Sequence, residues 1–153
     1  MAVDLETWFR ERIPEAWFAD EPRCRADREE ILVVGTLPGG VDPEEFREDT
    51  RQDRVGIAQL AETTFERKVS WAVRQEDVEL RFTTASVPVM TRLRMDERRV
   101  LDTLIAGGVA RSRSEALAWC VRLVGEHERD WIDEMGEAAA RIAEVRRKGP
   151  SPA

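Results

Sequence analysis

The stretch VMTRLRMDE, residues 89–97, decides the fold predicted for the second half of this 153-residue chain. Its polar and apolar residues alternate, as they do along an extended strand whose successive side chains point to opposite faces. One face would carry Thr91, Leu93 and Met95, and the other Met90, Arg92 and Arg94. The second face is therefore basic, although the whole chain has a formal net charge of −7.

Two helices are predicted directly after this strand. Asp96 is a residue of the kind that caps a helix N-terminus, and Gly107-Gly108 would end the first helix. Ser112 would start the second, with Glu115 at the position that a capping box requires. Both helices have an apolar face, which is formed by Val100, Leu101, Leu104 and Ile105 in the first and by Ala116, Leu117, Cys120, Val121 and Val124 in the second.

A strand and two short helices cannot bury these apolar faces within one chain. A single strand also leaves its backbone hydrogen-bonding groups without partners. Two copies solve both problems, because their strands can pair antiparallel about a twofold axis while four helices enclose a common core. The sequence therefore predicts a homodimer formed through residues 88–126.

The order and spacing of these pieces resemble the ribbon-helix-helix family, to which the Met and Arc repressors belong. The matching features are the alternating strand with basic outward residues, the polar helix cap, the glycine turn and the RSRSE start of the second helix at residues 111–115. The resemblance covers about 40 of the 153 residues. Their order and spacing together are more specific than any one of them.

The resemblance implies that double-stranded DNA is a partner. In this family the paired strands enter the major groove, where outward side chains touch base edges. Carried over by position, the base-reading residues are Met90, Arg92 and Arg94. The start of the second helix would offer free backbone N–H groups to a phosphate, and the residues there are Arg111, Ser112, Arg113 and Ser114. The family's habit implies a transcriptional repressor or autoregulator.

The negative charge of the chain lies almost wholly in its first half. Residues 89–153 hold 12 Lys and Arg against 11 Asp and Glu, a net charge of +1, so the first 88 residues hold 12 against 20, a net of −8. Residues 90–113 alone carry a net charge of +3. Because salt screens charges beyond about 8 Å, the sign of the whole chain does not exclude a nucleic-acid partner.

The first half predicts a β-α-β-β domain behind an aromatic lead-in. The lead-in, residues 1–26, includes an amphipathic helix over 3–13 with Leu5, Trp8, Phe9 and Ile13 on one face. This face would dock on the protein's own next domain or on a partner. In the domain, residues 27–87, we expect a strand over 30–37 covered on both faces, a helix from Asp42 to about Arg67, and two further strands. A helical tail occupies residues 127–153, and the fold class is α+β.

Other classes of function find little support in the sequence. With one histidine and two distant cysteines, neither a zinc site nor a disulfide framework is indicated. No Ser/His/Asp or Cys/His grouping has signature spacing, and the glycine-rich GTLPGG lacks the ending of a phosphate-binding loop, so we expect no enzyme and no cofactor. No apolar run reaches the roughly 18 residues that a membrane span needs. No secretory signal is recognised, and the expected location is the cytoplasm.

Two alternatives remain open. The chain could be an antitoxin-like or adaptor protein, in which the acidic first half or the tail binds a protein partner and DNA contact serves autoregulation. It could also be an interaction module that uses the ribbon-helix-helix fold only to dimerise. In that case Arg92 and Arg94 would serve solubility or pair with acidic residues of the first half.

Overall fold

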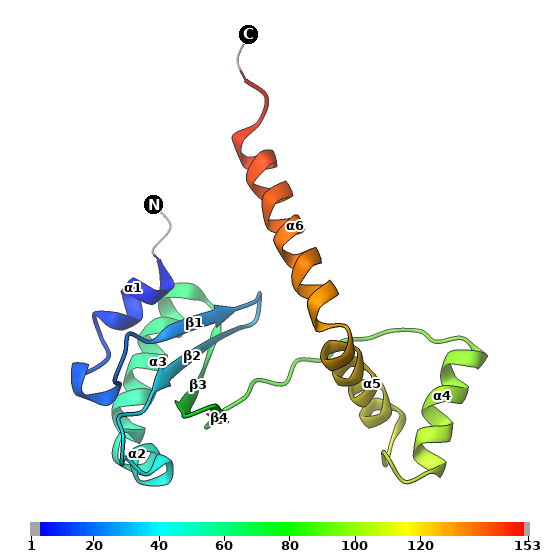
Figure 1. Cartoon of the computed structure of the whole chain (residues 1–153), viewed down its shortest axis with the longest axis horizontal. Helices are drawn as coiled ribbons and strands as arrows, with labels where there is room; N and C mark the ends of the chain where they lie inside the picture. The colour runs from blue at the N-terminus through cyan, green and yellow to red at the C-terminus, as the bar shows by residue number, and fades with distance from the viewer. Residues whose placement is uncertain (1–3, 152–153) are drawn as a thin grey trace. The chain divides into compact units, whose positions relative to one another are not determined.

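The computed structural model describes residues 4–151 and has a mixed α+β fold (Figure 1). The chain divides into two compact units, Met1–Val89 and Met90–Ala153. The elements of the first unit are α1 (Leu5–Arg10), the 3-10 helix η1 (Glu15–Trp17), β1 (Arg23–Ala26), β2 (Glu30–Thr36), α2 (Pro43–Asp49), α3 (Arg51–Phe65), β3 (Lys68–Gln75) and β4 (Val78–Arg81). Those of the second unit are α4 (Met95–Ala106), α5 (Arg113–His127) and α6 (Arg129–Lys148).

The first unit is built on a four-stranded sheet of order β1-β2-β3-β4. β2 and β3 are parallel, whereas β1 and β4 pair antiparallel with their neighbours. Parallel neighbours need a crossover connection, which α2 and α3 provide. The predicted β-α-β-β order is present from β2 to β4, but β1 was not predicted. Its sequence, RCRA, is short and mostly polar, and its backbone is held by pairing such as Cys24 opposite Val33.

The single helix predicted from Asp42 to about Arg67 is wrong in one respect, because the helix is broken at Thr50. Asp42 does cap α2, and its Oδ2 accepts a hydrogen bond from the Glu45 N–H at 3.0 Å. The Thr50 hydroxyl donates to the Phe46 carbonyl at 2.7 Å, one turn back. Thr50 is the C-cap of α2 and the N-cap of α3, so α3 starts afresh at Arg51.

The aromatic lead-in packs into the same core as the sheet. Trp8, Phe9 and Ile13 are buried, and Phe9 is fully so. The ring of Phe9 meets that of Trp71 on β3 edge to face, with centroids 6.2 Å apart. The docking expected for this apolar face is thus on the protein's own sheet domain. The helix itself is shorter than predicted, ending at Arg10.

The helices of the first unit share this core with one face of the sheet. The strand residues in it are Ile31, Val33, Val69, Trp71 and Val73. On the other face Leu32 and Ala72 are buried but Val34 and Thr36 are only partly so. The coverage of both faces that the apolar sequence of β2 predicted is therefore incomplete. The strand residues on that second face include Arg23, Arg25, Arg74 and Arg81, together with Glu79.

In the second unit the helices form close to where they were predicted, but the strand does not. Residues 83–94 have no regular secondary structure. The strand predicted at 89–95 is thus absent from the described single chain, because its backbone groups have no neighbouring strand to pair with. α4 begins at Met95 with Arg94 as N-cap, rather than at the predicted Asp96, because the Glu97 carboxylate accepts the Arg94 N–H at 2.7 Å.

The second unit has a very small core. Its buried apolar residues are Leu101, Ala110 and Ala116. Three residues predicted to be buried in the core of a dimer are exposed in the single chain, since Val100, Val121 and Val124 are 54%, 66% and 50% exposed. One chain contains too few facing side chains to cover these helix faces. The second unit therefore presents a broad apolar surface to its surroundings.

Candidate nucleic-acid interface

The predicted base-reading residues lie on the extended segment that leads into α4. Met90 is 96% exposed, and Arg92 and Arg94 are exposed as well. Leu93, between the two arginines, packs against the small core of the second unit. Of the residues predicted to face inward, only Leu93 does so, because Thr91 and Met95 are exposed in the single chain. In the part of the chain that the structure describes, no carboxylate lies within ion-pair distance of either arginine.

The end of this segment is tied to the first turn of α4. The Arg98 guanidinium donates from Nη1 to the Leu93 carbonyl at 2.6 Å. Together with the bond from the Arg94 N–H to Glu97, this contact holds the backbone at residues 93–94 while the side chains of Arg92 and Arg94 remain free. A backbone that is already held at residues 93–94 would lose less freedom there on binding.

The predicted phosphate-binding residues surround the N-terminus of α5. The Ser112 Oγ caps the helix by accepting the Glu115 N–H at 3.1 Å. Arg113 forms a bidentate ion pair with Asp102 of α4, with Nε–Oδ1 and Nη2–Oδ2 distances of 2.8 and 2.9 Å. These hydrogen bonds lower the pKa of Asp102 and raise that of Arg113.

Arg111 is held in a similar way. The Glu115 carboxylate accepts the Arg111 backbone N–H at 2.6 Å and also lies 3.3 Å from its Nε. The backbone bond from Arg111 is the main cause that lowers the pKa of Glu115. Both arginines next to the α5 cap are thus paired with carboxylates in the free chain. Ser114 is exposed in the first turn of the helix.

The two sets of residues are not brought together within one chain. The predicted base-reading residues lie before the first residue of α4, whereas the N-terminus of α5 comes after the last residue of α4. A 12-residue helix is about 18 Å long, so the sets are spaced along the unit rather than gathered in one pocket. That spacing is compatible with an extended ligand and unsuited to a small molecule.

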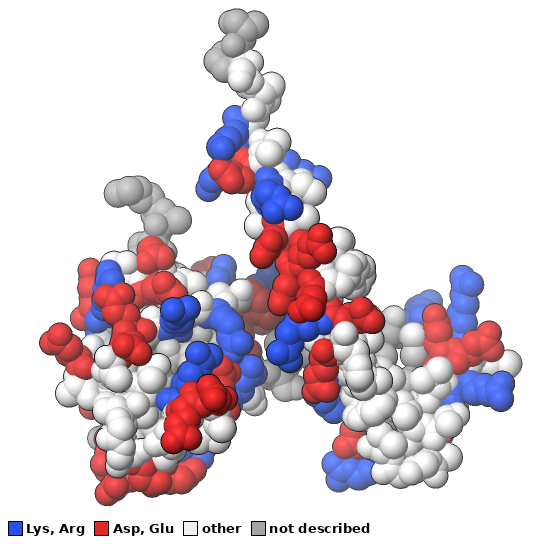
Figure 2. Space-filling model, viewed as in Figure 1, with Lys and Arg blue, Asp and Glu red and all other residues white. Residues whose placement is uncertain are grey.

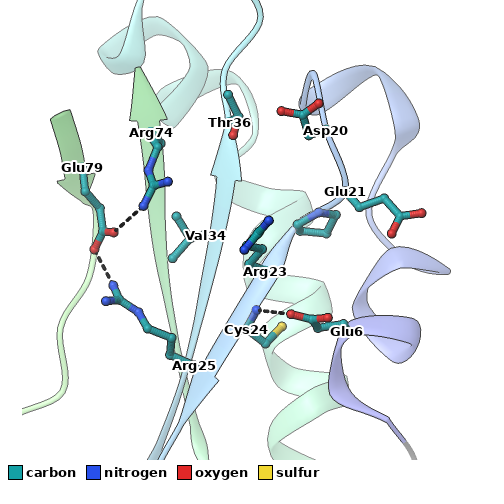
Figure 3. A pocket seen from close by; sticks show the side chains of 11 residues that line it. Glu6, Asp20, Glu21, Arg23, Cys24, Arg25, Val34, Thr36, Arg74 and Glu79 are labelled. Carbon is teal, nitrogen blue, oxygen red and sulfur yellow. Dashed lines mark hydrogen bonds and ion pairs between the residues drawn. The ribbon is translucent and has the colours of Figure 1, made fainter. Parts of the chain in front are cut away.

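A second polar site lies on the exposed face of the sheet and was missed in the sequence (Figure 3). Arg25, Arg74 and Arg81 surround the Glu79 carboxylate, at N–O distances of 2.6, 3.9 and 3.5 Å. Arg25, Arg74 and Glu79 border a hollow of about 960 Å³ whose other wall carries Glu6, Asp20 and Glu21. Acidic and basic walls offset each other, so the hollow has no clear preference for anions. The alternation of Arg23, Cys24 and Arg25 was the only pattern in the sequence that could have indicated an arginine-bearing strand face here.

Arg54 is the one buried charged residue that could suggest catalysis among those described. Its guanidinium donates to the Thr50 Oγ1 at 3.0 Å and to the Arg47 carbonyl at 2.8 Å, and it lies 5.0 Å from the centre of the Phe82 ring. Burial lowers its pKa. Every one of these contacts joins α2, α3 and the end of β4, so the role of Arg54 is to hold the first unit together.

The remaining chemistry of the described residues is sparse. No group of three or more His, Cys, Asp or Glu side chains lies close enough to bind a metal in residues 4–151. Burial raises the pKa of the Cys24 thiol to about 12, so it stays protonated at neutral pH and is a poor nucleophile. Over the same residues, no helix is both long and apolar enough to cross a bilayer.

Comparison with known proteins assigns both halves of the chain. Residues 3–81 match the model of the Rv1265-like protein N-terminal domain, and residues 94–146 match that of the Mb1296 C-terminal domain. Uncharacterized protein Rv1265 of Mycobacterium tuberculosis strain H37Rv and Uncharacterized protein Mb1296 of Mycobacterium bovis are each 47% identical to this chain over 155 residues, covering 94% of it and 69% of the relative. The chain belongs to the Rv1265 family.

The names of these Rv1265 family members state no activity, so function has to be argued from the residues. No solved structure matches the chain significantly. The two matched ranges leave residues 82–93 outside, and Met90 and Arg92 lie in this interval. Arg94 and the whole α5 N-terminus lie inside the C-terminal match.

Proposed function

We propose that this chain is a dimeric, sequence-specific DNA-binding protein with a ribbon-helix-helix second unit, acting as a transcriptional repressor or autoregulator. The observation that carries the proposal is that the second unit covers its own apolar helix faces only in part. Its core has three buried apolar residues, two of them alanines, while Val100, Val121 and Val124 stay exposed. Monomeric proteins rarely expose apolar residues in such continuous faces, which mark interaction sites.

A second copy of the chain fits this surface. In a ribbon-helix-helix dimer, residues 89–94 of the two chains pair antiparallel and so satisfy their backbone groups. The helix faces that carry Val100, Val121 and Val124 then close a common core. The same pairing would place Met90, Arg92 and Arg94 of both chains on one outward face, four arginines in all.

The side chains on that face suit the major groove. Arginine donates two parallel hydrogen bonds to guanine O6 and N7, each good contact contributing about 1–3 kcal/mol of discrimination. Neither Arg92 nor Arg94 would have to break an ion pair within its own described chain to reach a base. Ser112, Arg113, Ser114 and Arg111, at the α5 N-terminus, would contact phosphates and fix the register without reading sequence.

The antitoxin-like or adaptor alternative is favoured by a different observation, the exposed apolar residues on α6. Trp131 and Met135 are 58% and 56% exposed, and the second-unit core described above does not include them. If a protein partner covered them, DNA contact would serve autoregulation. The two functions share the dimer and differ in what the rest of the chain binds.

Selection of duplexes from random oligonucleotides by the full chain, combined with sedimentation of the free protein, tests the proposal. We expect a dimer at micromolar concentration and a palindromic selected site. A folded monomer at that concentration, or a selection without enrichment, would contradict it. A dimer that enriches no sequence would leave the interaction-module alternative in its place.

Replacing Arg113 with alanine should weaken binding about equally on all DNA sequences. Each phosphate contact releases condensed counterions from the DNA. A plot of the logarithm of the binding constant against the logarithm of salt concentration therefore falls with a slope of about 0.9 per contact. A dimer carries two copies of Arg113, so the slope should become shallower by about 2. Fluorescence anisotropy titrations at several salt concentrations measure it.

Arg122→Ala is the matched control, since Arg122 is exposed on the same helix α5 but lies away from its N-terminus. The salt dependence of DNA binding by Arg122→Ala should have the same slope as that of the unchanged protein. A loss for Arg113→Ala that differs from one DNA sequence to another would contradict the phosphate role.

A further inference from the structure

Helix α6 carries an apolar stripe that the described residues of the second unit leave exposed. The stripe consists of Trp131, Met135, Ala138, Ile142 and Val145. Successive members are 4, 3, 4 and 3 residues apart, which is the spacing of the two core positions in a coiled coil. The four large residues are 54–68% exposed. At 1.5 Å per residue the stripe is about 21 Å long, enough for a helix pair.

The charges of α6 are divided between its two halves. Of its 20 residues, the first ten contain four acidic and one basic residue, and the last ten contain four basic and one acidic. Figure 2 shows the acidic residues gathered on the lower part of this helix and most of the basic ones on the upper part. Interaction with the helix dipole is confined to the terminal turns. It does not account for Glu134, Glu137 and Arg141, which lie in the middle.

We propose that α6 pairs antiparallel with α6 of a second copy of this chain through the stripe. Antiparallel pairing brings the acidic half of each helix beside the basic half of the other. A parallel pair would instead place like charges together along its whole length. The occupant of the stripe is thus identified by charge complementarity as α6 itself.

One register pairs three of the four large apolar residues of the stripe and also the charges that flank them, leaving Val145 opposite Glu128 at the end of the pair. Trp131 packs opposite Ile142 of the second copy, and Met135 packs opposite Ala138. Glu134 and Arg141, which flank the stripe, then face each other across the pair twice. Shifting one helix by a heptad would place Arg141 against its own copy and leave Trp131 without a partner. Across helices, opposite charges of this kind set partner and orientation.

This pairing lies outside residues 88–126 and needs no DNA. It holds two copies of the chain by a contact separate from the proposed ribbon. Two weak contacts between copies strengthen each other, because the second forms at a high effective concentration. The tail would therefore help to keep the DNA-binding unit assembled.

Cysteine trapping in the full chain tests the pairing. On a Cys24→Ser/Cys120→Ser background, the double variant Glu134→Cys/Arg141→Cys should form a covalent dimer under mild oxidation, seen on a non-reducing gel. Each single variant should form at least tenfold less covalent dimer than the double variant. In the antiparallel register position 134 of one copy faces position 141 of the other, and neither faces itself. Within one helix these positions are about 10 Å apart, too far for a disulfide.

A matched pair of substitutions shows whether the stripe drives the trapping. Ile142→Gln, placed in the double variant, should lower its trapping rate at least tenfold, whereas Ala140→Gln, on the opposite side of the helix, should leave it unchanged. Both positions are exposed, and circular dichroism would check that the helix persists. A double variant that stays uncoupled, or single variants that couple as fast, would overturn the proposal. Selection of specific DNA is a separate readout, so either proposal can fail alone.

Discussion

Replacing both Arg92 and Arg94 with alanine should lower the affinity for the selected DNA about 100-fold or more. Each good arginine–guanine contact contributes about 1–3 kcal/mol, and a dimer would lose up to four of them. Both side chains are exposed, and neither is part of the second-unit core. The variant should therefore remain folded and dimeric. Anisotropy titration with specific and scrambled duplexes measures affinity, and sedimentation measures assembly.

The control for this experiment removes the same charge elsewhere. Arg99→Ala combined with Arg122→Ala changes two exposed arginines of α4 and α5 that lie outside the predicted interface. This variant should retain the preference for the specific over the scrambled duplex. If the Arg92/Arg94 variant also retained that preference, the base-reading role proposed for these two residues would be contradicted. The dimer could then survive as an interaction module.

Replacing Gly35 with alanine should destabilise the first unit by about 3 kcal/mol. Gly35 is buried in β2, and an added Cβ would lie 2.2–2.3 Å from three atoms of the Phe18 ring. The ring cannot easily retreat, because Phe18 is itself buried and packs on Phe46 with centroids 5.7 Å apart. Overpacking of a core costs about 1–3 kcal/mol, occasionally more. Urea unfolding followed by near-ultraviolet circular dichroism measures the change.

Gly56→Ala is the matched control for this substitution. Gly56 lies within α3, and a Cβ there would meet no atom within 4 Å. Alanine should stabilise the helix by about 0.5–1 kcal/mol, because glycine is a poor helix former. Adding Phe18→Leu to Gly35→Ala should recover part of the lost stability by opening space. Equal stability of Gly35→Ala and the unchanged protein would show that the ring moves freely.

Much of the candidate interface can be predicted from local patterns. The cap at Ser112, the glycine stop after α4 and the helical tail all depend on residues a few positions apart. The alternation around Leu93 places Leu93 inward, next to exposed Arg92 and Arg94, but the other two residues predicted on the inward face, Thr91 and Met95, are exposed in the single chain. By contrast, the pairing of Arg113 with Asp102 joins two helices across a turn, and no local pattern signals it. The proposed strand would find its pairing partner only in a second chain, and no local pattern in the sequence shows that partner.

Sequence by itself determined the helices of the second unit, the alternating strand β3 and the apolar face of the aromatic lead-in, because these follow from periodicity and capping between near neighbours. Only the tertiary structure showed that this face docks on the protein's own sheet, because the sequence had left a partner surface open as well. Tertiary structure alone decided that RCRA forms β1, because its strand backbone is satisfied only by β2. It also decided that Glu79 gathers three arginines, because sheet register brings together residues up to 54 positions apart. Contacts at such separations depend on the packed sheet, and short-range propensity carries no information about them.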